Sequence, residues 1–327
     1  MVSFFETNIT VSGQIFYKFD ANGFFMATNL EAFSDYLQKE KKYSPYTVCA
    51  YVNDVTDFQE FNKVNFEQED VVRVEYTQIR SWLVFLVESG LSTLSVNRKV
   101  SSLKAFYRFL LKTKQIEVSP LLKHRALKVS KKVQIPFSEK ELEMVLENIE
   151  SGSGFEVVRD KLLVELLYST GIRRSELINL KFDAVDFSCK TIKVLGKRNK
   201  ERIIPVLEIV LDQMRLYVKE RESLRNIEDG EYFFLTEKGL KLNESFVYRL
   251  INSYFSKVSE KVKRSPHMLR HTFATHLLNN GADLNSVKEL LGHSSLASTQ
   301  VYTHNSLLEL KKVYVGAHPR GSDDSKV

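Results

Sequence analysis

The chain of 327 residues contains only two cysteines, Cys49 and Cys189, which lie far apart and form no CxxC pair. A disulfide framework therefore has no support, and a reducing compartment such as the cytoplasm fits this composition. No apolar run approaches the roughly 20 residues needed to cross a bilayer. The N-terminal residues also lack the basic start, apolar block and small-residue cleavage site of a signal peptide. The sequence therefore predicts a cytoplasmic protein without a membrane partner.

Acidic residues are almost absent from residues 98–132, where eleven basic side chains accompany one acid, Glu117. The whole chain carries a net charge of +6, so its balance leans towards polyanions, and the position of the charge matters more than its sum. Basic residues recur every four positions between apolar ones, which predicts an amphipathic helix with a cationic stripe. The stripe suits a phosphate backbone, and a solvated helix face explains it equally well. The candidates for contact with such a backbone in this segment are Arg98, Lys99, Lys104, Arg108 and Lys112.

Length and periodicity predict two domains. Residues 28–115 contain about four helical segments, one of which begins at Ser44 and Pro45, a good N-cap and first helical position. Residues 116–136 are basic and weakly periodic, which indicates an extended interdomain linker. Residues 137–316 form the second domain, in which Ser138 and Glu141 have capping-box spacing. Residues 1–27 are an extension without an assigned role, and residues 317–327 are a tail.

The second domain changes its period along the chain. The segment "VVRDKLLVELLYST" is apolar at helical spacing and is followed by Gly171, a typical helix end. The segment "KTIKVLGKRNKERIIPV" alternates on both sides of a turn that starts at Gly196, which predicts a β-hairpin with a basic tip. The fold class is therefore mainly α, an all-helical N-terminal domain followed by a mostly α domain with a small antiparallel sheet.

The stretch "SPHMLRHTFATH" gathers three histidines and an arginine, which could bind a metal ion or a phosphate. Ser265 and Pro266 predict a helix start, so His267 and Arg270 lie in the first turns and face one side. Exposed amides, the helix dipole and a guanidinium group favour an anion there. His267 and His271 have the spacing of zinc ligands, but the stretch contains no acidic residue and no HExxH pattern. Phosphate is the favoured ligand.

Other residues join this stretch in a set with several donors, one potential nucleophile and no carboxylate. The set consists of Arg173, Lys197, His267, Arg270, His293 and Tyr302. With "TGIRRSEL", "GKRNKERIIP", "HMLRHTFATHLLNNGADLNSVKELLGHSSLASTQVYTH" and "HPRG", the chain resembles the tyrosine recombinases of the phage-integrase family, most closely their Xer branch. The resemblance implies a SAM-like core-binding domain followed by a catalytic domain of the DNA breaking-rejoining fold.

The resemblance also implies roles for these side chains around a scissile phosphate. Arg173 and Arg270 would stabilise the negative charge of the phosphorane, which is the chemistry that guanidinium groups suit. His293 would bind the same oxygens. His267 would stabilise the phosphorane or take the proton of Tyr302.

Tyr302 would attack the phosphate to give a 3′-phosphotyrosine link, and Lys197 would protonate the leaving 5′ oxygen. No cofactor and no metal are expected, because the link keeps the energy of the phosphoester and the arginines supply the positive charge. Arg174, Arg198 and Lys200 are further candidates for contact with the DNA backbone.

The implied partners are double-stranded DNA with a specific recombination site and a homo- or hetero-tetramer that joins two such sites through a Holliday junction. A second recombinase and an FtsK-type translocase are further candidate partners. The C-terminal helix either exchanges with a neighbouring protomer or packs on its own domain. Chromosome dimer resolution is favoured over the integrase or invertase of a mobile element. A DNA-binding protein without catalysis and a zinc hydrolase are remoter alternatives.

Overall fold

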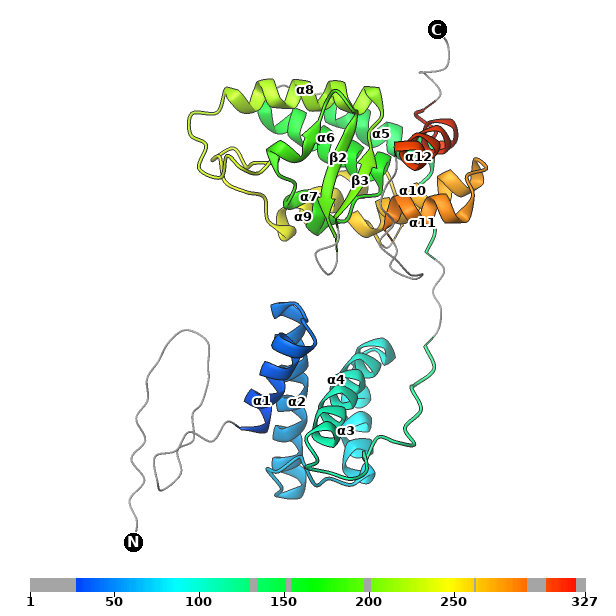
Figure 1. Ribbon diagram of the computed structural model, residues 1–327. Coiled ribbons are helices and arrows are strands. Elements are labelled where there is room, and N and C mark those ends of the chain that lie inside the picture. Colours follow the sequence, from blue (N-terminus) through cyan, green and yellow to red (C-terminus); the bar gives the residue numbers. More distant parts are fainter. Residues whose placement is uncertain are drawn as a thin grey trace. The chain divides into compact units, whose positions relative to one another are not determined.

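The computed structural model describes residues 28–129, 134–150, 154–196, 201–261, 263–292 and 304–321. The chain separates into two compact units, residues 1–132 and 133–327. Helices dominate both units, and the described strands form one antiparallel sheet of three strands (Figure 1). This agrees with the mainly α fold class that the sequence predicts. None of the described helices combines the length and the apolar character needed to pass through a bilayer.

The regular elements in the described part of the first unit are all helices. Its elements are α1 (Asn29–Asp35), the π-helix η1 (Tyr36–Glu40), α2 (Pro45–Phe66), α3 (Tyr76–Glu88) and α4 (Thr93–Lys112). The Ser44 side chain accepts a hydrogen bond from the backbone N–H of Thr47, and Pro45 occupies the first turn of α2. The predicted start of this helix is therefore confirmed, because the cap satisfies an amide that the helix itself leaves without a partner.

Aromatic side chains from all four α-helices make the core of the first unit. Phe58 of α2 and Trp82 of α3 pack with ring centroids 5.1 Å apart, and Phe33 of α1 meets Phe106 of α4 edge to face at 5.3 Å. All four side chains are buried. The apolar side of the predicted cationic helix thus faces this core, and its basic residues lie outside the core.

Part of the predicted linker packs on the first unit. Leu121 is buried, and Ile116 and Leu127 lie against the same core. The side chain of Asn97 binds both backbone groups of Leu127, donating to its carbonyl and accepting from its N–H at 2.9 Å each. The apolar residues between the charges of the predicted linker thus pack on the first unit, and the described part of this segment contains no helix or strand.

The second unit contains the remaining elements. Its helices are α5 (Glu139–Glu150), α6 (Phe155–Thr170), α7 (Arg174–Ile178), η2 (Phe182–Ala184), α8 (Glu208–Glu222), α9 (Glu244–Ser256), α10 (Pro266–Asn279), α11 (Leu284–Leu291) and α12 (His304–Ala317). Its strands are β1 (Val185–Asp186), β2 (Thr191–Leu195) and β3 (Glu201–Pro205). The predicted capping box of α5 is present, since Ser138 and Glu141 each accept from the backbone N–H of the other.

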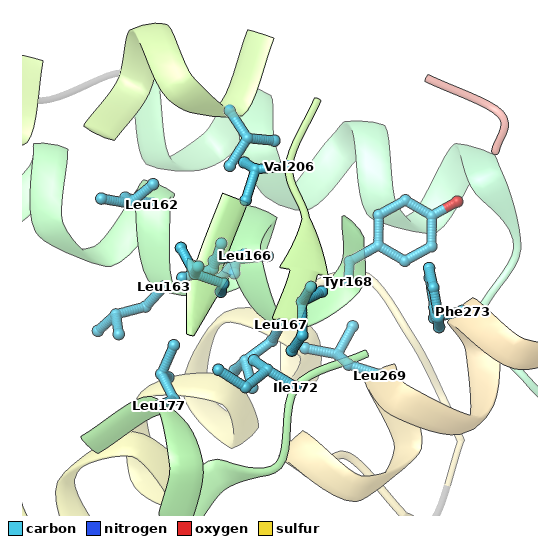
Figure 2. Packing of buried hydrophobic residues seen from close by; sticks show 14 of the residues in the cluster. Leu162, Leu163, Leu166, Leu167, Tyr168, Ile172, Leu177, Val206, Leu269 and Phe273 are labelled. Carbon is cyan, nitrogen blue, oxygen red and sulfur yellow. The ribbon is translucent and has the colours of Figure 1, made fainter. Parts of the chain in front are cut away.

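Helix α6 runs through the centre of the second unit and is buried on every side along its C-terminal half. Figure 2 shows its leucines among side chains of other elements, including Leu177 of α7, Val206 after β3 and Leu269 of α10. A helix that is apolar all round is typical of a buried core element. Helices α7 and α10 are therefore held against a common support.

The predicted β-hairpin is confirmed as the antiparallel pair β2 and β3, with Val194 opposite Arg202 and Ile192 opposite Ile204. The very short β1 extends the sheet beside β2 and was not predicted. A strand of two residues carries too little alternation to be recognised in a sequence. The buried positions of β3 include Arg202 and Ile204, which lie two residues apart on one face.

The C-terminal helix α12 packs within its own unit. Leu310, Tyr314 and Ala317 are buried, and the Tyr314 hydroxyl donates to the carbonyl of Ser169 at 2.8 Å. The described part of α12 thus covers its own domain within the single chain, and exchange with a neighbouring protomer stays a prediction. Within the predicted tail, His318 and Gly321 are buried.

Candidate active site

A tight turn between α6 and α7 places Arg173 at the start of α7. Gly171 ends α6 in the left-handed conformation with φ 59°. A Cβ atom at this position would lie 2.4 Å from Cδ1 of Phe273, so both the backbone and the packing require glycine. Only Gly171 and Ile172 therefore separate α6 from Arg173, the N-cap of α7.

Arg173 is held by two residues, Glu176 and Gly292. Its Nη1 donates to Oε1 of Glu176 at 2.7 Å, and its Nη2 donates to the carbonyl of Gly292 at 3.1 Å. Its backbone N–H donates to the other carboxylate oxygen of Glu176 at 2.8 Å. About a third of the side chain, 32%, is exposed. The guanidinium group is thus oriented by the protein and still accessible to a ligand.

Arg270 reaches the same place from α10, where the predicted N-cap Ser265 and first-turn Pro266 are confirmed. Its Nη1 donates to the carbonyl of Gly171 and its Nη2 to the carbonyl of Leu291. Since Arg173 binds Gly292 and Arg270 binds Leu291, both guanidinium groups meet at the C-terminal end of α11. The two arginines that the sequence proposes as partners are brought together.

Positive charge exceeds negative charge at this site. Among the described residues, the three guanidinium groups of Arg173, Arg202 and Arg270 lie around one carboxylate, that of Glu176, which leaves a net charge of +2. Burial, followed by the charges of Arg173 and Arg202, lowers the pKa of Arg270 to about 9, so this group still carries its proton at neutral pH. Burial alone would raise the pKa of Glu176, but the hydrogen bonds and charges of Arg202 and Arg173 outweigh it and hold the pKa below its ordinary value. An anion would relieve the excess charge.

The three histidines of the stretch "SPHMLRHTFATH" have different surroundings. His267 is exposed in the first turn of α10. The ring of His271 contacts the carbonyl of Gln134 at 3.2 Å, and His276 shares a hydrogen bond of 2.9 Å with the hydroxyl of Tyr168. Within the described ranges, His, Cys, Asp and Glu do not gather in a group of three that could hold a metal ion.

Five of the predicted functional residues lie outside the described residues. They are Lys197, Arg198, Lys200, His293 and Tyr302. Their described neighbours in the chain are Gly196 after β2, Gly292 at the end of α11 and His304 at the start of α12. The carbonyl of Gly292 accepts a hydrogen bond from Arg173, and His293 is the next residue in the sequence.

Several of the predicted DNA-contacting residues are engaged within the protein. Arg98 and Lys99 both bind the buried carboxylate of Asp54, at 2.6 and 3.0 Å. Lys112 pairs with Glu40.

Two residues of the α4 stripe, Lys104 and Arg108, have no ion pair among the described residues, and Arg108 is exposed. In the second unit Arg174 pairs with Glu244. Fewer basic residues of α4 are therefore available for DNA contact than the composition of the segment suggests.

Arg202 is a member of the site that the sequence analysis missed. It lies in β3, six residues after Gly196, and is 6% exposed. A signal was present, because alternation along β3 places it on the same face as the apolar Ile204. An arginine on the buried face of a strand requires a carboxylate partner, since an isolated buried charge is very costly.

The chain matches two family models. Residues 30–114 match the phage integrase N-terminal SAM-like domain, and residues 137–308 match the phage integrase family. The chain therefore belongs to the phage integrase family. A protein named tyrosine recombinase XerC from Oceanobacillus iheyensis is 40% identical over 302 residues, which cover 90% of this chain and 96% of that protein. Another of the same name, from Chlorobaculum parvum, is 38% identical over 315 residues, 89% of this chain and 94% of that protein.

Solved structures agree on the fold. The Tn1549 transposon integrase in complex with transposon right end DNA gives a TM-score of 0.68 at 21% identity, covering 88% of this chain and 99% of that chain. The XerH site-specific recombinase bound to a palindromic difH substrate gives 0.66 at 21% identity, covering 90% of this chain and 83% of that chain. At this identity the likeness concerns the arrangement of helices and strands.

Proposed function

We propose that the chain is a site-specific recombinase that cuts and rejoins double-stranded DNA through a covalent bond to Tyr302. The observation that carries the proposal is the meeting of Arg173 and Arg270 at the end of α11, with positive charge in excess. A phosphodiester under attack gains negative charge on its non-bridging oxygens, and preorganised guanidinium groups stabilise that charge. Membership of the family supports the tyrosine as nucleophile.

In the cleavage step the Tyr302 oxygen forms a bond to phosphorus, and the bond from phosphorus to the 5′ oxygen breaks. The proton of Tyr302 passes to a base, for which His267 is the candidate, and Lys197 gives a proton to the departing oxygen. His293 binds a non-bridging oxygen. The phosphoester bond is retained as a 3′-phosphotyrosine, so a 5′-hydroxyl of another strand reverses the reaction without ATP. The arginines supply the charge stabilisation, so the mechanism assigns no step to a divalent cation.

The proposed role is Xer-like chromosome dimer resolution. The proteins named XerC, at about 40% identity over nine-tenths of the chain, favour this role over that of a mobile-element integrase. It requires four protomers, identical or of two kinds, that pair two DNA sites and exchange strands through a Holliday junction. A second recombinase and an FtsK-type DNA translocase are the proposed partners, and the bacterial cytoplasm is the proposed location.

Phosphate contacts supply most of the DNA affinity in this proposal. Lys104 and Arg108 of α4 are the candidate contacts in the first unit, because no described carboxylate pairs with them. Every neutralised phosphate releases counterions, so binding weakens steeply as salt rises. Specificity for one site then depends on contacts with base edges and on the shape of the duplex.

The test uses a DNA site recovered by sequencing the DNA trapped covalently on the protein in cells. A nick beside the cleavage position lets a short fragment leave, so an active enzyme stays attached to the DNA. The Tyr302→Phe variant is expected to form no covalent adduct and to bind DNA as the parent does, because only a hydroxyl is removed. The matched control is Tyr248→Phe, a half-exposed tyrosine of α9, which is expected to cleave normally. Cleavage by the Tyr302→Phe variant would refute the nucleophile.

A further inference from the structure

Arg202 and Glu176 form a buried ion pair with two parallel contacts. Nη1 of Arg202 donates to Oε1 of Glu176 at 2.5 Å and Nη2 donates to Oε2 at 2.8 Å. The side chains are 6% and 2% exposed, respectively. Such a two-point contact fixes the plane of the carboxylate as well as its position.

The carboxylate that Arg202 fixes is also the one that orients Arg173. Oε1 of Glu176 accepts from Nη1 of Arg173, and Oε2 accepts from the Arg173 backbone N–H. Both oxygens are therefore shared between the two arginines. Because Arg202 satisfies a large part of the carboxylate, Arg173 makes only one side-chain contact with it. The remaining donors of Arg173 stay available to a phosphate.

Arg202 also packs against the end of α11. Gly292 adopts the left-handed conformation with φ 62°, and a Cβ atom there would lie 2.8 Å from Cδ of Arg202. The carbonyl of the same glycine accepts from Nη2 of Arg173. Arg202 thus touches both groups that hold Arg173, the carboxylate on one side and the turn after α11 on the other.

Stability alone does not account for a third guanidinium group at this place. A buried ion pair is often no more stabilising than an apolar pair of similar size. Here the extra positive charge also lies close enough to Arg270 to disfavour its charged form. This arrangement is unfavourable in the free protein and becomes favourable when an anion enters the site.

We infer that Arg202 is a positioning residue for DNA cleavage, which holds Glu176 and the turn at Gly292 so that Arg173 faces the scissile phosphate. This inference rests on the proposed function. Without Arg202, both oxygens of Glu176 become available to Arg173. The carboxylate then draws the guanidinium group into a two-point pair and withdraws it from the phosphate.

The experiment compares Arg202→Met and Arg202→Lys with the parent in single-turnover cleavage of the nicked DNA site, at saturating protein. Loss of one preorganised donor at a reacting centre typically costs about 10²- to 10³-fold in rate. Arg202→Met is therefore expected to cleave about 10²-fold more slowly, with DNA affinity within about threefold of the parent. Arg202→Lys keeps one charged contact and is expected to recover part of the rate. The matched control is Lys193→Met, which removes the exposed pair of Lys193 and Glu201 from the same hairpin and is expected to cleave normally.

A second substrate separates positioning from a general loss of structure. A methylphosphonate at the scissile position replaces one charged oxygen by a methyl group, so Arg173 has less negative charge to stabilise on the reacting group. The ratio of parent to Arg202→Met rates is expected to fall at least tenfold on this substrate. An equal ratio on both substrates, or an unchanged rate on the natural one, would overturn the positioning role. If the parent itself forms no adduct with the natural site, the proposed function fails instead.

Discussion

Replacing Gly171 by alanine tests whether the turn between α6 and α7 sets both the stability of the second unit and the position of its arginines. The residue has φ 59°, and an added Cβ would lie 2.4 Å from Cδ1 of Phe273 and 2.9 Å from Cδ2 of Leu291. A left-handed conformation costs a residue with a side chain about 1–2 kcal/mol, and overpacking a core adds about 1–3 kcal/mol. The free energy of unfolding is therefore expected to fall by about 2–5 kcal/mol.

The matched control is Gly281→Ala in the same unit. Gly281 has φ 90°, and a Cβ atom there meets no heavy atom within 4 Å, so only the backbone term of about 1–2 kcal/mol applies. In a unit of this size, each kcal/mol lowers the Tm by about 2–4 °C. Calorimetry is expected to show a decrease of about 4–20 °C for Gly171→Ala and about 2–8 °C for the control.

Cleavage provides an independent measurement of the same change. The carbonyl of Gly171 accepts from Arg270, so a backbone shift moves a guanidinium group of the site. The Gly171→Ala variant is expected to form the covalent adduct at least tenfold more slowly, whereas Gly281→Ala stays within about twofold, since only a group aimed at the reacting phosphate affects the rate strongly. Equal stability losses in the two variants, or normal cleavage by Gly171→Ala, would refute this account of the turn.

Four further outcomes are expected. Arg270→Lys should slow single-turnover cleavage about 10²-fold with little change in DNA affinity, because lysine cannot offer the forked donor; an unchanged rate would exclude Arg270 from the site. Excess chelator should leave cleavage unchanged, and inhibition that added metal reverses would restore the zinc alternative. Replacing Lys104 and Arg108 together by glutamine should weaken DNA binding in a filter assay. The slope of the logarithm of the binding constant against the logarithm of salt concentration should become less steep by about two phosphate contacts, and an unaltered slope would show that α4 does not contact the DNA. Burial lowers the pKa of His318 to about 3, so the stability it contributes is complete above its unfolded pKa near 6.5 and is lost as pH falls towards 3. In urea titrations between pH 6 and 4, His318→Phe should therefore reduce the change of the unfolding free energy with pH by up to about 1.4 kcal/mol per pH unit. The same pH dependence in both proteins would contradict the shift.

Local signals in the sequence predict the element boundaries that matter for the site. Ser265 and Pro266 predict the start of α10, and Gly171 predicts the end of α6, because each signal acts through backbone groups within a few residues. The hairpin follows from alternation in the same way. These boundaries place Arg173 and Arg270 at helix starts before any tertiary contact is considered.

Tertiary pairing of charges could not be predicted by the same means. Asp54 lies 44 residues before Arg98, and nothing in either segment indicates that its carboxylate binds that arginine. Arg202 and Glu176, 26 residues apart, present the same difficulty. A sequence does not show whether a basic residue faces solvent or pairs with a buried carboxylate. The composition of α4 therefore overestimates the number of its basic residues that are available to a ligand.

Under the proposed function, the carboxylate of Asp54 would affect how long the protein stays on DNA of random sequence. It binds Arg98, Lys99 and the hydroxyl of Ser102, and so keeps two cations of α4 occupied when no target is present. A searching protein must leave random sequence quickly, and every extra phosphate contact prolongs each visit. In the proposed function, Asp54 would shorten each such visit, because the cations that it binds are not free to contact phosphates.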